Sequence, residues 1–298
     1  MKKILGQPTT IWIVILLIAA ELRLPFIDKF PPIGPGLLWL RILTGVTSLF
    51  TIWSTMYLVK QKSSLLLAYA VGVIMTVTPW HIENSRIYSP AMLSLALVLI
   101  IGLIINSSLN RIIKFIAVLL ISLFISLVYK DLWFLSIPLK DLSLFNRFSE
   151  KAFHLLSGEW LFFKNETFWG GGLRTSGVFL PSFIPFYYLG LMILLRRINK
   201  NHIPLFITIV VWWIISALNP RYPEGREFFF VLPLFCLAVA QGLVFVVSKI
   251  KRQHYLIKVV ILTYFLFMAY EYTVYAHDYI NHYSHRVNNE IPYEQRTF

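Results

Sequence analysis

The chain has 298 residues, of which 57% are apolar and only 14% are charged, whereas a soluble domain usually carries about a quarter charged residues. A soluble protein this apolar could not cover its surface with polar side chains, so the composition excludes an ordinary water-soluble domain and favours lipid as the solvent. The net charge of +13 is spread singly between apolar runs, which argues against nucleic-acid binding because there is no extended basic domain.

Apolar runs follow one another along the whole chain, and each is close to the roughly 20 residues that a membrane-spanning helix needs. They lie near residues 9–27, 36–59, 64–80, 90–107, 113–130, 178–195, 203–218, 227–248 and 255–274. The sequence therefore predicts an all-α fold, a polytopic transmembrane helix bundle of about nine spanning helices in residues 1–275. A short C-terminal tail, 276–298, follows the bundle.

The basic residues predict the orientation of this bundle. If the N-terminus is cytoplasmic, alternating the nine helices places 13 basic residues and no acidic residue at the inner face. Cytoplasmic loops carry such an excess, so we expect a multi-pass protein of the cell membrane with its N-terminus inside and its C-terminus outside. A cleaved signal peptide ending at Ala20 is the alternative, and it is disfavoured because Ile18, three positions before that cut, is not small.

One long polar segment, 131–177, falls on the outer side. It contains many aromatic residues and the run Gly170-Gly171-Gly172. Without a following lysine–serine phosphate-loop pattern, these glycines are weak evidence for nucleotide binding. The aromatic pattern instead predicts short amphipathic helices that lie at the outer membrane interface.

Ionisable residues at membrane depth are costly and are functional candidates for that reason. The first group, Glu21, Arg23 and Asp28, lies at the outer end of the first apolar run. Glu21 and Arg23 are two residues apart, so they point to different faces of one helix. The group is either a set of interfacial salt bridges to neighbouring helices or a source of one carboxylate that acts as general base for an acceptor hydroxyl.

A second group surrounds the outer junction of the third and fourth runs. Pro79 ends the third helix, and His81, Glu83 and Arg86 are expected to emerge at the membrane surface after it. Glu83 and Arg86 are three residues apart and could simply pair with each other. Arg86 could also bind a phosphate through two parallel hydrogen bonds.

A third group, Arg221, Tyr222 and Arg226, precedes the eighth run. Two arginines at the start of a helix form an anion site, to which the free N–H groups of the helix N-terminus contribute; solvated loop charges are the alternative. The fourth group is the tail, whose histidines have the spacing of a loose metal cluster. Neutral histidines on a tyrosine-rich segment explain that spacing better, so we predict no metal site from His277, Asp278, His282 and His285.

All four groups fall on one side of the predicted membrane. Carboxylates and at least three arginines gathered there indicate an outward-facing site. Such a site suits an anionic, phosphorylated ligand that is carried by a lipid.

Four segments of the chain resemble, in order, parts of the bacterial GT-C glycosyltransferases. These are the relatives of the protein mannosyltransferases and of the aminoarabinose transferase that modifies lipid A. The segments are Thr78–Arg86 (TPWHIENSR), Gly177–Leu195 (GVFLPSFIPFYYLGLMILL), Asn219–Leu243 (NPRYPEGREFFFVLPLFCLAVAQGL) and Tyr270–Arg286 (YEYTVYAHDYINHYSHR).

The resemblance implies transfer of a sugar from a polyprenyl-phosphate donor to an acceptor on the outer face, with inversion. It implies Asp28 as the base, with Glu21 as its substitute. The phosphate would be held by arginines and the substrate site completed by their neighbours: Arg86, Arg221 and Arg226, with His81, Glu83 and Tyr222. Some relatives use a divalent cation as cofactor.

The chain departs from this family in two places. Family members carry an Asp-Glu pair after the first helix, where Pro35 and Gly36 stand here, and a soluble C-terminal domain that this sequence lacks. The departures favour a first alternative, a catalytically inactive lipid-binding or assembly subunit that works with a partner membrane subunit. A transporter is the second alternative, and it is disfavoured because few charges fall at mid-membrane.

Overall fold

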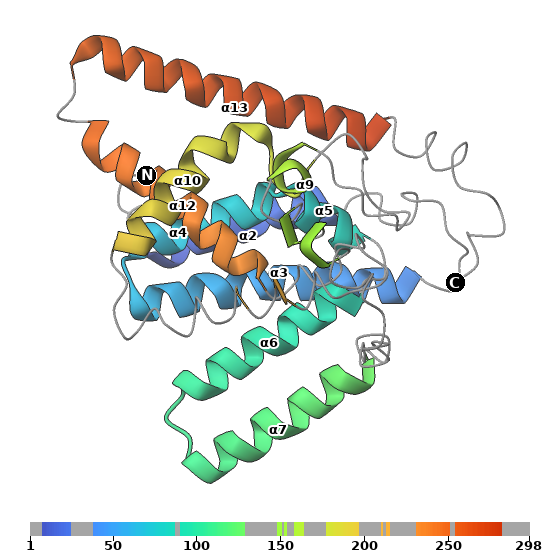
Figure 1. Cartoon of the computed structure of the whole chain (residues 1–298). Helices are drawn as coiled ribbons and strands as arrows, with labels where there is room; N and C mark the ends of the chain where they lie inside the picture. Colours follow the sequence, from blue (N-terminus) through green and yellow to red (C-terminus); the bar gives the residue numbers. More distant parts are fainter. Residues whose placement is uncertain are drawn as a thin grey trace.

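The computed structural model of the chain describes residues 8–24, 38–86, 90–128, 148–150, 152–153, 158–163, 177–196, 210, 213–214, 231–250 and 254–281. Every regular element in these residues is a helix (Figure 1), so the all-α prediction is confirmed. In chain order the elements are α2 (Pro8–Arg23), α3 (Leu38–Lys62), α4 (Leu65–Val77), α5 (Pro79–Arg86), α6 (Pro90–Asn106), α7 (Arg111–Val128), α9 (Glu159–Phe162), η3 (Pro181–Phe183), α10 (Ile184–Arg196), α12 (Leu232–Ile250) and α13 (Tyr255–Asn281).

Three of the described helices, α3, α12 and α13, are long and apolar enough to cross a membrane. The pair α4 and α5 also passes this test as one unit, bent by 59°. A membrane location is therefore supported, with fewer spans than the nine that the sequence predicts. The reason is helix length: α10 has 13 residues, which at about 1.5 Å per residue cover roughly 20 Å of a core about 30 Å thick. The seventh predicted span, 203–218, lies largely outside the described residues.

The termini of the helices lie at two opposite ends of the molecule. The turn from α3 to α4, the turn from α6 to α7 and the facing ends of α12 and α13 lie toward the left of Figure 1, while α5 and α9 lie toward the right. Local hydrogen bonds define the left-hand turns. Ser64 Oγ accepts from the Leu67 N–H at 3.2 Å and caps α4, and Lys114 Nζ donates to the carbonyl oxygens of Ile105 and Ser107 after α6.

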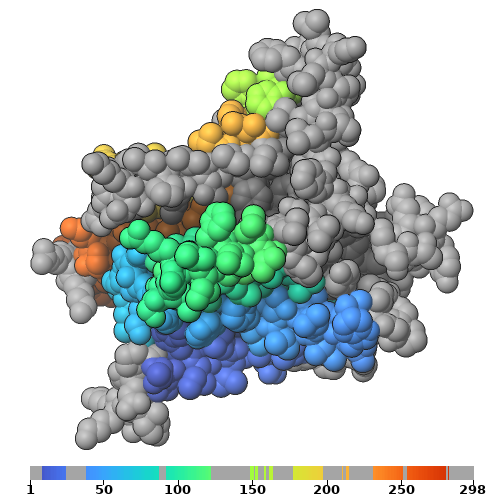
Figure 2. Space-filling view, turned by 90° about the horizontal axis from the view of Figure 1, so that it is seen from below, coloured from blue at the N-terminus to red at the C-terminus, as the bar shows by residue number. Residues whose placement is uncertain are grey.

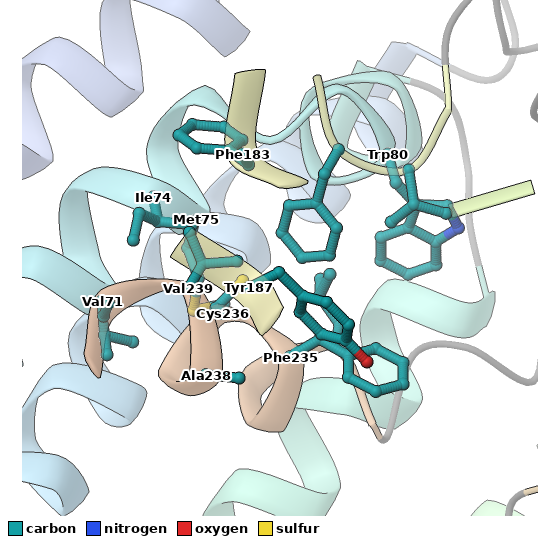
Figure 3. Packing of buried hydrophobic residues seen from close by; sticks show 14 of the residues in the cluster. Val71, Ile74, Met75, Trp80, Phe183, Tyr187, Phe235, Cys236, Ala238 and Val239 are labelled. Atoms are coloured by element: carbon teal, nitrogen blue, oxygen red, sulfur yellow. The ribbon is translucent and has the colours of Figure 1, made fainter. Parts of the chain in front are cut away.

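The core lies between α4, α10 and α12. Val71, Ile74 and Met75 of α4 share one buried cluster with Val239 of α12, and the Phe235 ring packs against Tyr187 of α10 (Figure 3). The α6–α7 hairpin packs against α3 through α6 (Figure 2), whose Met92, Leu95 and Leu99 belong to the core. In the part of α7 whose side chains are described, residues 111–121, the apolar side chains are largely exposed, as expected of a helix whose solvent is lipid.

Part of the segment predicted to lie at the interface is instead buried. Leu161 and Phe162 of α9 belong to the core, and the Phe162 ring packs against Phe179 and Tyr187. The Leu161 carbonyl oxygen accepts from the Phe179 N–H at 2.8 Å. These two side chains of α9 therefore pack into the protein, because the segment after Gly177 folds back over it. Most of 131–176 lies outside the described residues, and the interfacial location stays a prediction.

Candidate functional site

A break between α4 and α5 creates the geometry of the site. The α4 helix ends at Val77, Thr78 has an extended backbone (φ −67°, ψ 121°), and Pro79 begins α5. Proline has no N–H, so it cannot donate to the Met75 carbonyl oxygen four residues earlier. The next N–H, of Trp80, donates to Val178 O at 3.4 Å. The last carbonyls of α4 therefore need other partners.

Arg23 supplies those partners from the end of α2. Its Nη2 donates to the carbonyl oxygens of Met75 and Thr76 at 3.2 and 3.1 Å, and its Nη1 donates to Ala19 O at 3.0 Å. The side chain is fully buried, and its cation sits at the negative end of the α4 dipole. Glu21 is exposed, so the prediction that the two side chains point to different faces is confirmed.

His81 joins Arg23 to the middle of α3. The ring is fully buried, with Nδ1 2.8 Å from Arg23 Nη2 and Nε2 2.9 Å from Thr51 Oγ1. The Thr51 hydroxyl in turn donates to Ser48 O at 2.7 Å. One imidazole therefore connects α2, α3 and α5.

The other end of α5 meets a row of tyrosines on α13. The Tyr275 hydroxyl lies 3.2 Å from Glu83 Oε1 and 3.4 Å from the Pro79 carbonyl oxygen, so it donates to this pair of acceptors. The Arg86 guanidinium carbon lies 5.6 Å from the centre of the Tyr279 ring, within the range of a cation–π contact. Tyr272, Tyr275 and Tyr279 follow one another on one face of α13, with ring centres 6.3 and 6.0 Å apart.

Arg41, near the start of α3, belongs to the same neighbourhood. It is buried, and it acts electrostatically on Tyr279 together with Arg86 and Glu83. Among the residues that the structure describes, the buried ionised side chains are thus three arginines and one carboxylate, Glu83. A local excess of positive charge in an apolar surrounding favours an anionic ligand.

The structure corrects one sequence expectation and adds new residues. His81, Glu83 and Arg86 do not emerge at a surface: all three are buried, because α3 and α13 cover α5. Sequence reasoning missed Arg41, Thr51 and the tyrosine row. The spacing of the tyrosines, i, i+3 and i+7, was a signal for one helix face, whereas Arg41 stood alone in an apolar run.

The remaining predicted residues are not placed. Asp28, Arg221, Tyr222 and Arg226 lie outside the described residues, as do His282 and His285. In the tail, α13 continues through His277 to Asn281, and His277 Nδ1 lies 3.8 Å from Asp278 Oδ1. The described part of the chain contains no group of three His, Cys, Asp or Glu residues that could hold a metal ion.

No protein-family model matches the chain, and neither a curated protein nor a solved structure is significantly similar to it.

Proposed function

We propose that the chain is a multi-pass membrane glycosyltransferase that binds a polyprenyl-phosphate sugar at the α5 end of the bundle and transfers the sugar to an acceptor there. The observation that carries the proposal is the buried group formed by Arg41, Arg86, Glu83 and the α13 tyrosines. Arginines bind phosphate through paired, charge-assisted hydrogen bonds, and tyrosine hydroxyls can donate to phosphate or sugar oxygens.

The distribution of basic residues supports an outer location for this group. Helix α3 ends with Lys60 and Lys62, α7 begins with Arg111, and the last turn of α12 carries Lys249. These helix ends lie opposite α5 (Figure 1). By the positive-inside rule the basic end is cytoplasmic, so the proposal includes several spans with the N-terminus inside and the C-terminus outside.

The proposed reaction is an inverting displacement. The acceptor hydroxyl oxygen forms a bond to the anomeric carbon as the bond from that carbon to the phosphate oxygen breaks, and polyprenyl phosphate leaves. The hydroxyl proton passes to a carboxylate, for which we retain Asp28. Glu21 fits this role poorly because it is exposed on the face of α2 away from Arg23. No step is assigned to a divalent cation, since the described donor set does not form a metal site.

The experiment is a titration of polyprenyl phosphate into the full chain in nanodiscs, with and without Arg86→Ala. Loss of a charge-assisted contact, worth about 1.5–3 kcal/mol, weakens binding about tenfold or more. Arg111→Ala, at the opposite end of the bundle, is the matched control and should leave the affinity unchanged. Equal affinities for all three proteins would contradict the proposal.

A non-catalytic lipid-binding or assembly subunit is the second candidate. It is favoured because the buried carboxylate, Glu83, already accepts a hydrogen bond from Tyr275 and so has a structural partner. Incubation with a polyprenyl-phosphate sugar and candidate acceptors separates the two. Release of free polyprenyl phosphate supports the transferase, whereas tight binding without release supports the subunit.

A further inference from the structure

We infer that Arg23 is a positioning residue: it repairs the break between α4 and α5 and, through a histidine held in one neutral tautomer, sets the direction in which Arg86 and Glu83 point. The part of this inference that concerns the bound anion rests on the proposed function. The helix break and the tautomer do not.

The break leaves carbonyl oxygens at the end of α4 without their N–H partners. Pro79 removes the N–H that would have bonded Met75 O, and Trp80 donates its N–H to Val178 instead of continuing α4. In an apolar surrounding an unsatisfied carbonyl costs several kcal/mol. The two Arg23 bonds to Met75 O and Thr76 O therefore make the 59° bend tolerable. Arg23 therefore donates its hydrogen bonds to backbone carbonyl groups rather than to a carboxylate.

The Arg23 guanidinium determines which ring nitrogen of His81 carries the proton. An arginine guanidinium only donates hydrogen bonds and stays protonated in proteins, so His81 Nδ1 must accept from Arg23 Nη2. Because Nη2 has two hydrogens and three acceptors, one hydrogen points at His81 and the other is shared by the neighbouring carbonyl oxygens of Met75 and Thr76. The ring proton then sits on Nε2 and is donated to Thr51 Oγ1, whose own hydrogen goes to Ser48 O. A second proton on Nδ1 would direct one N–H at another and place two cations side by side. His81 is thus a neutral connector and neither a phosphate ligand nor a proton carrier.

A small rotation at the start of α5 becomes a larger displacement at its end. Arg86 is the last of the eight residues of α5, roughly 10 Å along the helix from the break at about 1.5 Å per residue. A rotation of α5 by only about 10° at Thr78 would move Arg86 by ~2 Å, enough to lose its place over the Tyr279 ring. Arg23 and Thr51 hold the first turn of α5 from two sides, so they determine where the arginine at its far end lies.

Two readouts test this without any lipid. In protein labelled with ¹⁵N-histidine, the His81 ring should show a protonated Nε2 and an unprotonated Nδ1 throughout pH 5 to 8. A ring that gains its second proton within that range would overturn the tautomer. In protein carrying 3-fluorotyrosine at position 279, Arg23→Met should move the ¹⁹F signal toward that of the Arg86→Ala reference. An unmoved ¹⁹F signal would overturn the positioning role.

A destabilised control separates positioning from general loss of stability. Gly190→Ala disturbs the distant contact of α10 with α12 and should leave the ¹⁹F signal of Tyr279 in place. If Arg23→Met does not fold, Thr51→Val serves instead, because it keeps the shape of the side chain and removes the hydroxyl that accepts the Nε2 proton and donates to Ser48 O. It should shift the same signal in the same direction, and no shift would count against the inference.

Binding of polyprenyl phosphate provides the third readout. Arg23→Met should weaken it at least about tenfold, while Glu21→Gln, two residues away on the exposed face, should not change it. Unchanged affinity in Arg23→Met would contradict the inference. If the unmutated protein binds no polyprenyl phosphate, the proposed function fails, and the ¹⁵N and ¹⁹F results still decide the role of Arg23.

Discussion

Three buried guanidinium groups meet different surroundings in this chain. Arg23 is surrounded by carbonyl oxygens and one imidazole, and Arg86 lies over the Tyr279 ring. Arg41 acts on the same ring from α3. The three guanidinium groups outnumber the one buried carboxylate, Glu83, so this part of the described structure carries a net positive charge. The arginines at the far end of α5 are therefore the groups that we expect an incoming anion to meet.

Tyr275→Phe should destabilise the protein by about 1–3 kcal/mol, because the buried Glu83 carboxylate loses a hydrogen-bond donor and keeps its desolvation cost. Thermal unfolding in detergent measures the change. Tyr270→Phe is the matched control, since Tyr270 is an exposed tyrosine on the same helix. If both variants unfold at the same temperature, the Tyr275–Glu83 contact does not contribute to stability.

The sequence identified part of this site and could not identify its surroundings. His81, Glu83 and Arg86 stand out because charged residues near a proline are unusual beside apolar runs. Their burial depends on Tyr275, which is 192 positions from Glu83, and no local pattern predicts that pairing. The sequence could not reveal the role of Arg23 for the same reason. Its acceptors are the backbone carbonyl oxygens of Met75 and Thr76, and every residue has such a group.

At the scale of helices, close backbone contact holds α10 against α12. A Cβ atom on Gly190 would collide with the Ala238 carbonyl oxygen, and one on Gly242 would collide with that of Phe186. Small residues permit such an approach between helices in membranes, where apolar burial alone gives little driving force. By contrast, α13 is held by polar groups: Tyr264 donates to Ser182 O at 2.8 Å and Glu271 accepts from the Ser182 N–H at 3.1 Å.

Gly190→Ala should cost about 1–3 kcal/mol, because the added methyl group meets rigid backbone and forces the two helices apart. Gly102→Ala is the control: its Cβ would lie 3.1 Å from Leu58 Cδ1, the end of a flexible side chain, and alanine is the better helix former. Urea or thermal unfolding of both variants measures the difference. A stability loss at Gly102 as large as that at Gly190 would refute the close-contact explanation.

At the scale of the whole molecule, the chain has two chemically different ends. The turns between α3 and α4 and between α6 and α7 carry basic residues, whereas the opposite end carries α5, α9 and the tyrosine row. Composition alone predicted helices and a membrane location, because both follow from long apolar runs. The number of spans was harder to predict, since an apolar run of about 20 residues contains shorter helices wherever a proline or a turn interrupts it, as Pro79 and Pro181 do here.

The orientation is testable with reporter fusions along the chain. Fusions after Lys62, Asn110 and Lys200 should report the cytoplasm, because the basic residues of those loops are retained inside. Fusions after Lys140 and Phe298 should report the outside. A signal from outside the cell at Lys200 would rule out the nine-span topology.

The most direct test of the central claim is photo-crosslinking with a polyprenyl phosphate that carries a diazirine next to its phosphate. The claim is that the phosphate binds at the α5 end, among Arg41, Arg86 and the tyrosines of α13. Mass spectrometry should then find the label on peptides from α5 and the C-terminal half of α13, and excess unlabelled lipid should compete it away. Competable labelling confined to the turns between α3 and α4 or between α6 and α7 would contradict the claim.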